Sequence, residues 1–303
     1  MQISFKRGGK MTEVIKGKKR YPFSKGILAK SITRTGIPII EIYEIVDEIH
    51  KKVKGKEKDE VESGYIKQLV CDCLLERGHQ TEERYYRITR EIKYLKKPLV
   101  IMIGGGTGVG KSTIAAEVAH RLEITRSIGS DGIREIMRYM VPYDFLPILH
   151  ESSFTAGKRL ENPFVKENLI FSFTQQVNSV AEGVQAFIKR GVKEGIHTML
   201  NGIHLVPGYI DLEEEKKDMF CFHYILHLSD IQSHIQQIYY RSEGSRRDPE
   251  RYIDQIKNIR EIQSFIKDMA DEKGVLVIEN DDIDSTINTI MEDIITKLEE
   301  VNK

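Results

Sequence analysis

The sequence predicts an α/β fold, in which a five-stranded parallel sheet flanked by helices follows a small, mainly helical N-terminal domain. From Pro98 onward, short apolar runs alternate with segments of helical periodicity. Continuous apolar strands separated by helices are typical of a buried parallel sheet. Before Lys96 the pattern is mainly helical and shows no long parallel-strand run. We therefore place one domain at residues 1–93 and a second at residues 94–303.

The N-terminal domain is predicted to begin with a hairpin. Residues 12–25 read as a strand, a tight turn at Gly17 and a second strand. The charged stretch 51–62 is predicted to be a solvent-exposed loop. Apolar residues recur at helical spacing in four segments, which we expect to be helices: 24–35, 41–54, 61–77 and 82–96.

The second domain shows five apolar segments that we expect to be the strands of the sheet: 98–105, 126–130, 196–205, 222–229 and 275–279. Between and after them lie segments that we expect to be helices, at residues 111–122, 132–140, about 165–190, about 230–240, about 250–272 and the C-terminal end. No internal repeat is visible. The alternation of the two patterns predicts helices on both faces of one sheet.

A glycine-rich segment follows the first of these strands. Residues 105–112, GGTGVGKS, fit the pattern G-x-x-x-x-G-K-[ST] and open an amphipathic helix. Glycines let successive backbone N–H groups converge on phosphate oxygens, and the helix N-terminus adds a positive dipole. We expect Lys111 to reach the β- and γ-phosphates of ATP and Ser112 to bind Mg²⁺. The predicted ATP contacts are Gly105, Gly106, Thr107, Gly108, Val109, Gly110, Lys111, Ser112 and Thr113. We call residues 105–112 the phosphate loop.

The end of the second strand favours a small-molecule kinase. Neither a guanine-reading N-K-x-D motif nor a D-x-x-G switch before one is present, which disfavours a GTPase. Asp131 stands where an acceptor hydroxyl must approach the γ-phosphate, so it can orient that hydroxyl or accept its proton. Arg134 and Arg138 lie four residues apart on one helical face, and guanidinium groups pair with phosphate and carboxylate. This pattern predicts an anionic acceptor; the alternative is a helix N-cap with two surface arginines.

An arginine-rich segment between two predicted helices is interpreted as a lid. It contains Arg241, Arg246 and Arg247, with glycine and proline between and after them. Arginines there could neutralise charge in the transition state. The predicted catalytic residues are therefore Arg246 of this segment together with Lys111 and Asp131, discussed above. The alternative is an ordinary basic loop. The predicted acceptor-binding residues are Asp131, Arg134, Arg138, His204, Arg241, Arg247 and Arg260.

The third strand contains a polar residue that is unusual for such a fold. Asn201 stands where we expect an acid that steadies Mg²⁺ through water. Either Ser112 and ATP hold the metal alone, or Asp131 takes over that role. His204, three residues on, either touches the acceptor or is a buried, hydrogen-bonded histidine.

Composition excludes several partner classes. The chain of 303 residues carries 46 basic and 46 acidic residues, so it lacks the basic excess of a nucleic-acid or membrane-surface binder. Its three cysteines cannot form a disulfide framework, and we see no signal peptide and no membrane-spanning run. We expect a cytoplasmic protein with a small-molecule substrate, no nucleic-acid partner and no membrane partner. A homo-oligomer is left open.

Four segments in order resemble the archaeal 2-phosphoglycerate kinases: GGGTGVGKST, SDGIREIMR, NGIHLVPG and RYIDQIKNIREIQSFI. The resemblance covers nearly the whole chain. It implies a P-loop kinase that transfers phosphate from ATP to 2-phosphoglycerate, giving 2,3-bisphosphoglycerate, the precursor of cyclic 2,3-diphosphoglycerate in some methanogens. It also implies Mg²⁺ dependence, stimulation by K⁺ and an archaeal cytoplasmic enzyme. Asn201 departs from the acid that we expect in relatives.

The N-terminal segment is similar to the ATP-cone, a small nucleotide-binding regulatory domain. The resemblance rests on residues 14–25, the helices that follow and the pair Tyr85 and Tyr86. It implies that the nine basic residues among the first thirty form a phosphate patch, although a cone fold that does not bind ATP also fits. Two other functions remain open for the chain: a kinase acting on a nucleoside or a sugar, and an ATP-sensing regulatory protein.

Overall fold

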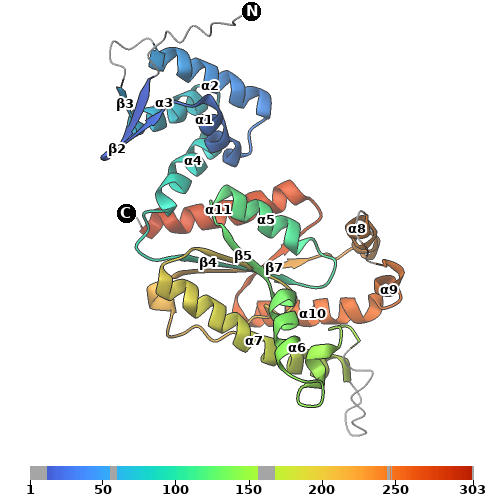
Figure 1. The fold of residues 1–303 in the computed structure, drawn as a ribbon. Helices are drawn as coiled ribbons and strands as arrows, with labels where there is room; N and C mark the ends of the chain where they lie inside the picture. The colour runs from blue at the N-terminus through green and yellow to red at the C-terminus, as the bar shows by residue number, and fades with distance from the viewer. Residues whose placement is uncertain (1–11, 55–59, 156–167, 244–245, 247, 302–303) are drawn as a thin grey trace, which may run out of the picture. The chain divides into compact units, whose positions relative to one another are not determined.

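The computed structural model describes residues 12–54, 60–155, 168–243, 246 and 248–301. The chain divides into two units, which we describe separately (Figure 1). Unit 1 comprises Met1–Tyr94 with Leu298–Lys303, and unit 2 comprises Leu95–Lys297.

Unit 1 combines a small sheet with helices. Strand β1 (Glu13–Lys16) pairs antiparallel with β2 (Lys19–Pro22) and parallel with β3 (Glu60–Glu62). The predicted hairpin with its turn at Gly17 is confirmed. The helices are α1 (Lys25–Ile32), α2 (Ile39–Lys54), α3 (Ser63–Glu76) and α4 (Gln80–Ile92), with a 3₁₀ turn η1 (Thr33–Thr35).

The prediction of a loop over 51–62 was wrong at both ends. Residues 51–54 complete α2, and β3 occupies the other end. Only Val61 of the three β3 residues is buried, so the strand leaves almost no hydrophobic pattern to recognise. Apolar residues of α1, α2 and α3 form most of the core of unit 1, and Cys71 and Cys73 belong to it.

Unit 2 contains five parallel strands in the order β5-β6-β4-β7-β8. These are β4 (Leu99–Gly105), β5 (Arg126–Gly129), β6 (Thr198–Asn201), β7 (Phe220–His227) and β8 (Leu276–Glu279). Every residue of the central strand β4 is buried. The predicted parallel α/β fold is therefore confirmed.

Helices cover both faces of this sheet (Figure 1). On one face lie α5 (Lys111–Arg121) and α11 (Ile283–Val301), and on the other α7 (Asn168–Glu194) and α10 (Ile256–Lys273). The remaining helical segments are α6 (Ser130–Met140), α8 (Ile231–Ser242), α9 (Glu250–Ile253) and the 3₁₀ turns η2 (Pro147–His150) and η4 (Lys216–Asp218). No helix in the described part of the chain is long and apolar enough to cross a membrane.

The register of the strands aligns the segments that carry function. Ile103 of β4 pairs with Asn201 of β6, which pairs with Gly129 of β5. Because all strands are parallel, the loops that follow them meet at one edge of the sheet, where ligands of such folds bind. Some predicted bounds were wrong: the helix expected at 250–272 is two helices, α9 and α10, which are separated at Asp254 and Gln255. The strand expected at 196–205 is the shorter β6, and the strand expected at 126–130 ends at Gly129.

The close packing at the end of β4 gives a test of the fold. A Cβ on Gly104 would lie 2.4 Å from the carbonyl oxygen of Leu205 and 2.6 Å from Cδ1 of Ile225. A backbone carbonyl cannot move aside cheaply, so we expect Gly104→Ala to lower the free energy of unfolding by about 1–3 kcal/mol. Thermal unfolding followed by circular dichroism measures the change.

The matched control is Gly132→Ala on α6, where a Cβ would meet nothing within 4 Å. Alanine favours the helix by up to roughly 1 kcal/mol there, so this variant should melt at the wild-type temperature or above it. Equal melting temperatures for the two variants would contradict the packing described here.

Candidate active site

A cavity of about 1070 Å³ opens at the carboxyl-terminal edge of the sheet of unit 2. Loops after all five strands contribute to its wall, as expected for a parallel sheet. The side chains and backbone that line it include the phosphate loop, the start of α6, the segment 152–154, residues 201–203, the second half of α8 and residues 280–283.

The phosphate loop joins β4 to α5, and α8 packs closely against it. Gly108 has φ of +89°, and a Cβ there would lie 2.8 Å from Cγ1 of Ile238 and 3.1 Å from Nε2 of His234. Glycine is therefore required both by the backbone conformation and by the contact with α8. Val109 points into the core and is fully buried, while Thr107, Gly108, Gly110, Lys111, Ser112 and Thr113 line the cavity.

Side chains from three elements hold the carbonyl groups of the loop. The Lys111 ammonium donates to the carbonyl of Gly106. His234 Nε2 on α8 donates to the carbonyl of Thr107 at 2.7 Å, and Asn280 Nδ2, just after β8, donates to that of Val109 at 3.0 Å. Buried carbonyls need such partners. Because its carbonyl groups are bonded in this way, the loop can direct its N–H groups towards a bound anion.

The surroundings of Lys111 shift the pKa of its ammonium group strongly. Burial lowers its pKa to about 7, although the Asp131 carboxylate raises it, and the Arg241 guanidinium lowers it further. A bound polyphosphate would favour the ammonium form, because opposite charge nearby stabilises a cation. This environment suits a lysine whose partner is an anionic ligand.

Oxygen ligands suited to Mg²⁺ lie beside the loop. Ser112 Oγ donates to Asn201 Oδ1 at 3.2 Å, and Asp131 lines the same cavity. Mg²⁺ prefers hard oxygen ligands and is usually held by few protein groups together with substrate phosphates. The Ser112 hydroxyl and the Asn201 amide oxygen, both uncharged, fit that arrangement.

The structure brings three of the predicted acceptor residues to the cavity. Asp131, in the first turn of α6, has a side chain that is 65% exposed. Arg134, one turn further, donates from Nη1 to the carbonyl of Glu151. Arg241 lines the cavity from the end of α8. One carboxylate and two guanidinium groups thus share the cavity with the phosphate loop.

Other predicted residues lie elsewhere. Arg138 donates to Glu135 at 2.6 Å, and Arg260 donates to the carbonyls of Leu228 and Ser229 at 3.2 and 2.7 Å. Neither they nor Arg246, which is exposed, are among the described residues that line the cavity. Arg247 lies outside the described residues, so the lid interpretation stays a prediction.

His204 is fully buried and engaged on both sides of its ring. Nδ1 lies 2.9 Å from Ser130 Oγ, and Nε2 lies 3.1 Å from Gln176 Oε1. Burial lowers the pKa of His204 to about 4, which keeps the ring neutral. The geometry agrees with the second alternative considered for this residue, a buried histidine with hydrogen-bonded partners.

Sequence reasoning missed several residues around the cavity. His234 and Asn280 support the loop, and Gln176 contacts His204. Arg251 of α9 donates to Ser152 Oγ at 2.8 Å, at the wall of the cavity. A usable signal existed for Gln176: it stands beside Phe173, Val177 and Val180 on the apolar stripe of a helix, where a polar residue needs a partner.

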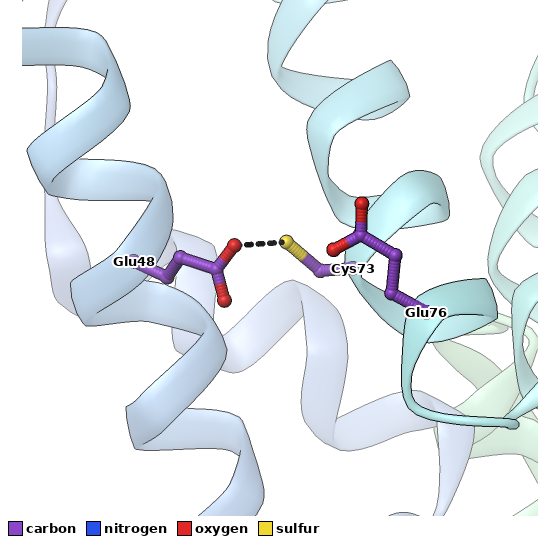
Figure 2. Close-up of side chains that lie close together, drawn as sticks. All are labelled: Glu48, Cys73 and Glu76. Atoms are coloured by element: carbon purple, nitrogen blue, oxygen red, sulfur yellow. Dashed lines mark hydrogen bonds between the residues drawn. The ribbon is translucent and has the colours of Figure 1, made fainter.

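A separate group of side chains lies in unit 1: Glu48, Cys73 and Glu76 (Figure 2). The Cys73 thiol donates to Glu48 Oε1 at 3.5 Å, and burial, together with Glu48, raises its pKa to about 11. Lys52 and Arg77 already contact the Glu48 carboxylate, at 2.7 and 3.4 Å. A metal ion would have to deprotonate the thiol and displace two cations, so we assign no site to this group.

Fold and site together define a class of protein. A glycine-rich loop between the first strand and its helix, in a parallel sheet with the first strand at its centre, is the arrangement of a P-loop kinase. Comparison with known proteins gives the family. The chain belongs to the 2-phosphoglycerate kinases of archaea, which confirms the resemblance found in its sequence.

Three relatives document this membership, and all are named 2-phosphoglycerate kinase. The protein of Thermococcus kodakarensis is 39% identical over 93% of this chain and 96% of its own length. That of Pyrococcus furiosus is 40% identical over 95% of this chain and 94% of its own. That of Methanocaldococcus jannaschii is 33% identical over 94% and 93%. Residues 12–94 match the ATP cone domain family.

Similarity to solved structures is weak. A shikimate kinase from Acinetobacter baumannii in complex with shikimate covers 71% of this chain and 98% of its own, with a TM-score of 0.39 and 13% identity. A similarity with so low a TM-score and identity does not indicate the substrate.

The support of the loop by Asn280 can be tested. Asn280→Asp replaces the NH₂ that donates to Val109 with a carboxylate oxygen, which repels both that carbonyl and a bound polyphosphate. We expect the affinity for ATP to fall about tenfold or more, as measured by isothermal titration calorimetry.

Asn288→Asp is the matched control, because it adds the same charge at an exposed position of α11. Its affinity for ATP should stay at the wild-type value. An unchanged ATP affinity in Asn280→Asp would contradict the role of this residue.

Proposed function

We propose that this protein transfers the γ-phosphoryl group of ATP to 2-phosphoglycerate and so forms 2,3-bisphosphoglycerate and ADP. One observation carries the proposal: the phosphate loop, the Asp131 carboxylate and the Arg134 guanidinium line a single cavity. Membership in the 2-phosphoglycerate kinase family supports the identity of the acceptor.

The phosphate loop and Lys111 would bind the β- and γ-phosphates, with the positive end of the α5 dipole behind them. The 3-hydroxyl oxygen of the acceptor then bonds to the γ-phosphorus, while the bond from that phosphorus to the bridging oxygen of ADP breaks. Asp131 orients the hydroxyl and accepts its proton. Positioning and charge stabilisation supply most of the catalysis in such transfers.

Mg²⁺ would be held by Ser112 and the nucleotide, with Asn201 beside it, and we propose K⁺ as an activator. The metal neutralises charge on the phosphates when it is bound. Because Asn201 carries no charge, the protein contributes less negative charge to the metal than a kinase with an acid at this position.

The acceptor would carry a carboxylate and a phosphate group, which explains the need for cations. Arg134 and Arg241 are in place at the cavity. We propose that Arg246 and Arg247 approach the transferred phosphoryl group when the segment between α8 and α9 closes over the substrates. We propose that Arg138 and Arg260 attract the negatively charged acceptor from a greater distance. The reaction would take place in the cytoplasm as the first step towards cyclic 2,3-diphosphoglycerate, without nucleic-acid or membrane partners.

A substrate panel tests the proposal. ADP release is measured with 2-phosphoglycerate, 3-phosphoglycerate, nucleosides and sugars as acceptors, with and without Mg²⁺. We expect activity with 2-phosphoglycerate that depends on Mg²⁺. Activity confined to nucleosides or sugars would instead indicate another small-molecule kinase, and slow ATP hydrolysis with no acceptor preference would indicate a regulatory protein.

The Lys111 ammonium should be essential. In Lys111→Ala we expect kcat to fall about 10³-fold, because a charge that stabilises the transition state is removed. Lys297→Ala, which removes an exposed lysine of α11, should keep wild-type activity. Near-normal activity of Lys111→Ala in the ADP-release assay would contradict the proposed mechanism.

Arg134 should serve the acceptor. We expect Arg134→Ala to raise KM for 2-phosphoglycerate about tenfold or more while KM for ATP changes little, because a guanidinium–anion contact is lost only on the acceptor side. Arg190→Ala, at an exposed position of α7, is the control. Equal changes in the two KM values would count against this role.

A further inference from the structure

A chain of buried polar side chains runs behind the acceptor side of the cavity. Gln176 and His204 are both fully buried, and Ser130 and Ser153 are nearly so. They come from α7, the loop after β6, the start of α6 and the segment after η2. Burying two such large polar side chains is costly unless every polar atom finds a partner.

The hydrogen bonds of Gln176 determine its orientation. One side of its amide lies 2.7 and 2.9 Å from the carbonyl oxygens of Ile148 and Glu151. Two carbonyl acceptors require the NH₂ group on that side, so Oε1 faces the other way. There it accepts from Ser153 Oγ at 2.6 Å and lies 3.1 Å from His204 Nε2.

This orientation assigns the tautomer of His204. Since Gln176 presents an oxygen, Nε2 of His204 must carry the proton, and Nδ1 must accept from Ser130 Oγ at 2.9 Å. Each polar side-chain atom of Gln176 and each ring nitrogen of His204 then has a hydrogen-bond partner, and every donor faces an acceptor. Such a network rigidifies its surroundings more than it stabilises them.

The network holds groups on the side of the cavity that we assign to the acceptor. Glu151 offers its carbonyl to both Gln176 and Arg134. Ser152 and Ser153 line the cavity next to it, and Ser130 precedes Asp131. We propose that Gln176 and His204 are positioning residues, which tie Arg134 and the segment 151–154 to the start of α6 and so fix the acceptor-binding side of the cavity.

This inference rests on the proposed function, and it predicts an effect on one substrate only. Gln176→Met and His204→Phe keep the approximate size of each side chain and remove its hydrogen bonds. We expect KM for 2-phosphoglycerate to rise about tenfold in both, with a lower kcat, and KM for ATP to stay within about twofold.

The conservative variant distinguishes positioning from packing. In His204→Gln the amide NH₂ can replace Nε2–H and donate to Gln176, so this variant should recover most of the acceptor affinity lost in His204→Phe. Gln263→Met, beside the phosphate loop, is the matched control. Gln263 is a second buried glutamine, which donates to the carbonyl of Leu228 and packs against Gly106, and its loss should not raise KM for 2-phosphoglycerate selectively.

The assay separates failure of the inference from failure of the proposed function. A wild-type protein that is inert with 2-phosphoglycerate overturns the proposed function, and the kinetics are then repeated with the acceptor found in the panel. A wild-type kinase whose Gln176→Met variant shows normal acceptor KM, or equal rises in both KM values, overturns the inference. The inference is also overturned if the KM of His204→Gln for 2-phosphoglycerate is as high as that of His204→Phe.

A spectroscopic measurement tests the hydrogen-bond network in the wild-type protein itself. In protein labelled with ¹⁵N-histidine, the imidazole signal that disappears in His204→Gln should show the neutral Nε2–H tautomer throughout pH 6–8. A signal with the proton on Nδ1, or one that titrates in this range, would overturn the network as assigned.

Discussion

An anion-binding loop must turn its N–H groups towards the ligand, and its carbonyl groups then need partners elsewhere. In this protein those partners come from distant parts of unit 2. The carbonyls of Gly106, Thr107 and Val109 are bonded by Lys111, His234 and Asn280, which belong to α5, α8 and the segment after β8. The conformation of the loop therefore depends on the whole sheet with its helices, and not on the glycine-rich segment alone. This explains why polar side chains as buried as His234 and Asn280 occur in this core.

The side of the cavity that we assign to the acceptor is built differently. There the cationic and acidic groups, Arg134 and Asp131, belong to α6, in which only Ser130 and Ile133 are buried. The positions of the two charged groups depend on the buried residues Gln176 and His204, whose donors and acceptors can be assigned in only one way. The two halves of the cavity thus use buried polar groups for one purpose, which is to hold backbone carbonyls in place next to a site for an anion.

The sequence alone predicts what depends on local patterns. The phosphate loop has a local signature, and the five strands are local apolar runs, so both were predicted and the parallel sheet was confirmed. The supporting contacts were not predictable, because they join residues far apart in the chain: Asn280 and Val109 are 171 residues apart, and His204 and Ser130 are 74 apart. The same limit applies to the arginines. Periodicity placed Arg134 and Arg138 on one face of a helix, yet only Arg134 lines the cavity, since Arg138 lies one turn further on and pairs with Glu135.

We propose that both halves of this cavity serve one transfer, from ATP to the 3-hydroxyl of 2-phosphoglycerate. The most direct measurement is ³¹P NMR of a mixture of the protein, MgATP and 2-phosphoglycerate over time. We expect a new phosphomonoester signal from carbon 3 that grows in a one-to-one ratio with ADP, without release of inorganic phosphate. ADP accompanied by inorganic phosphate, with the 2-phosphoglycerate signal unchanged, would contradict it.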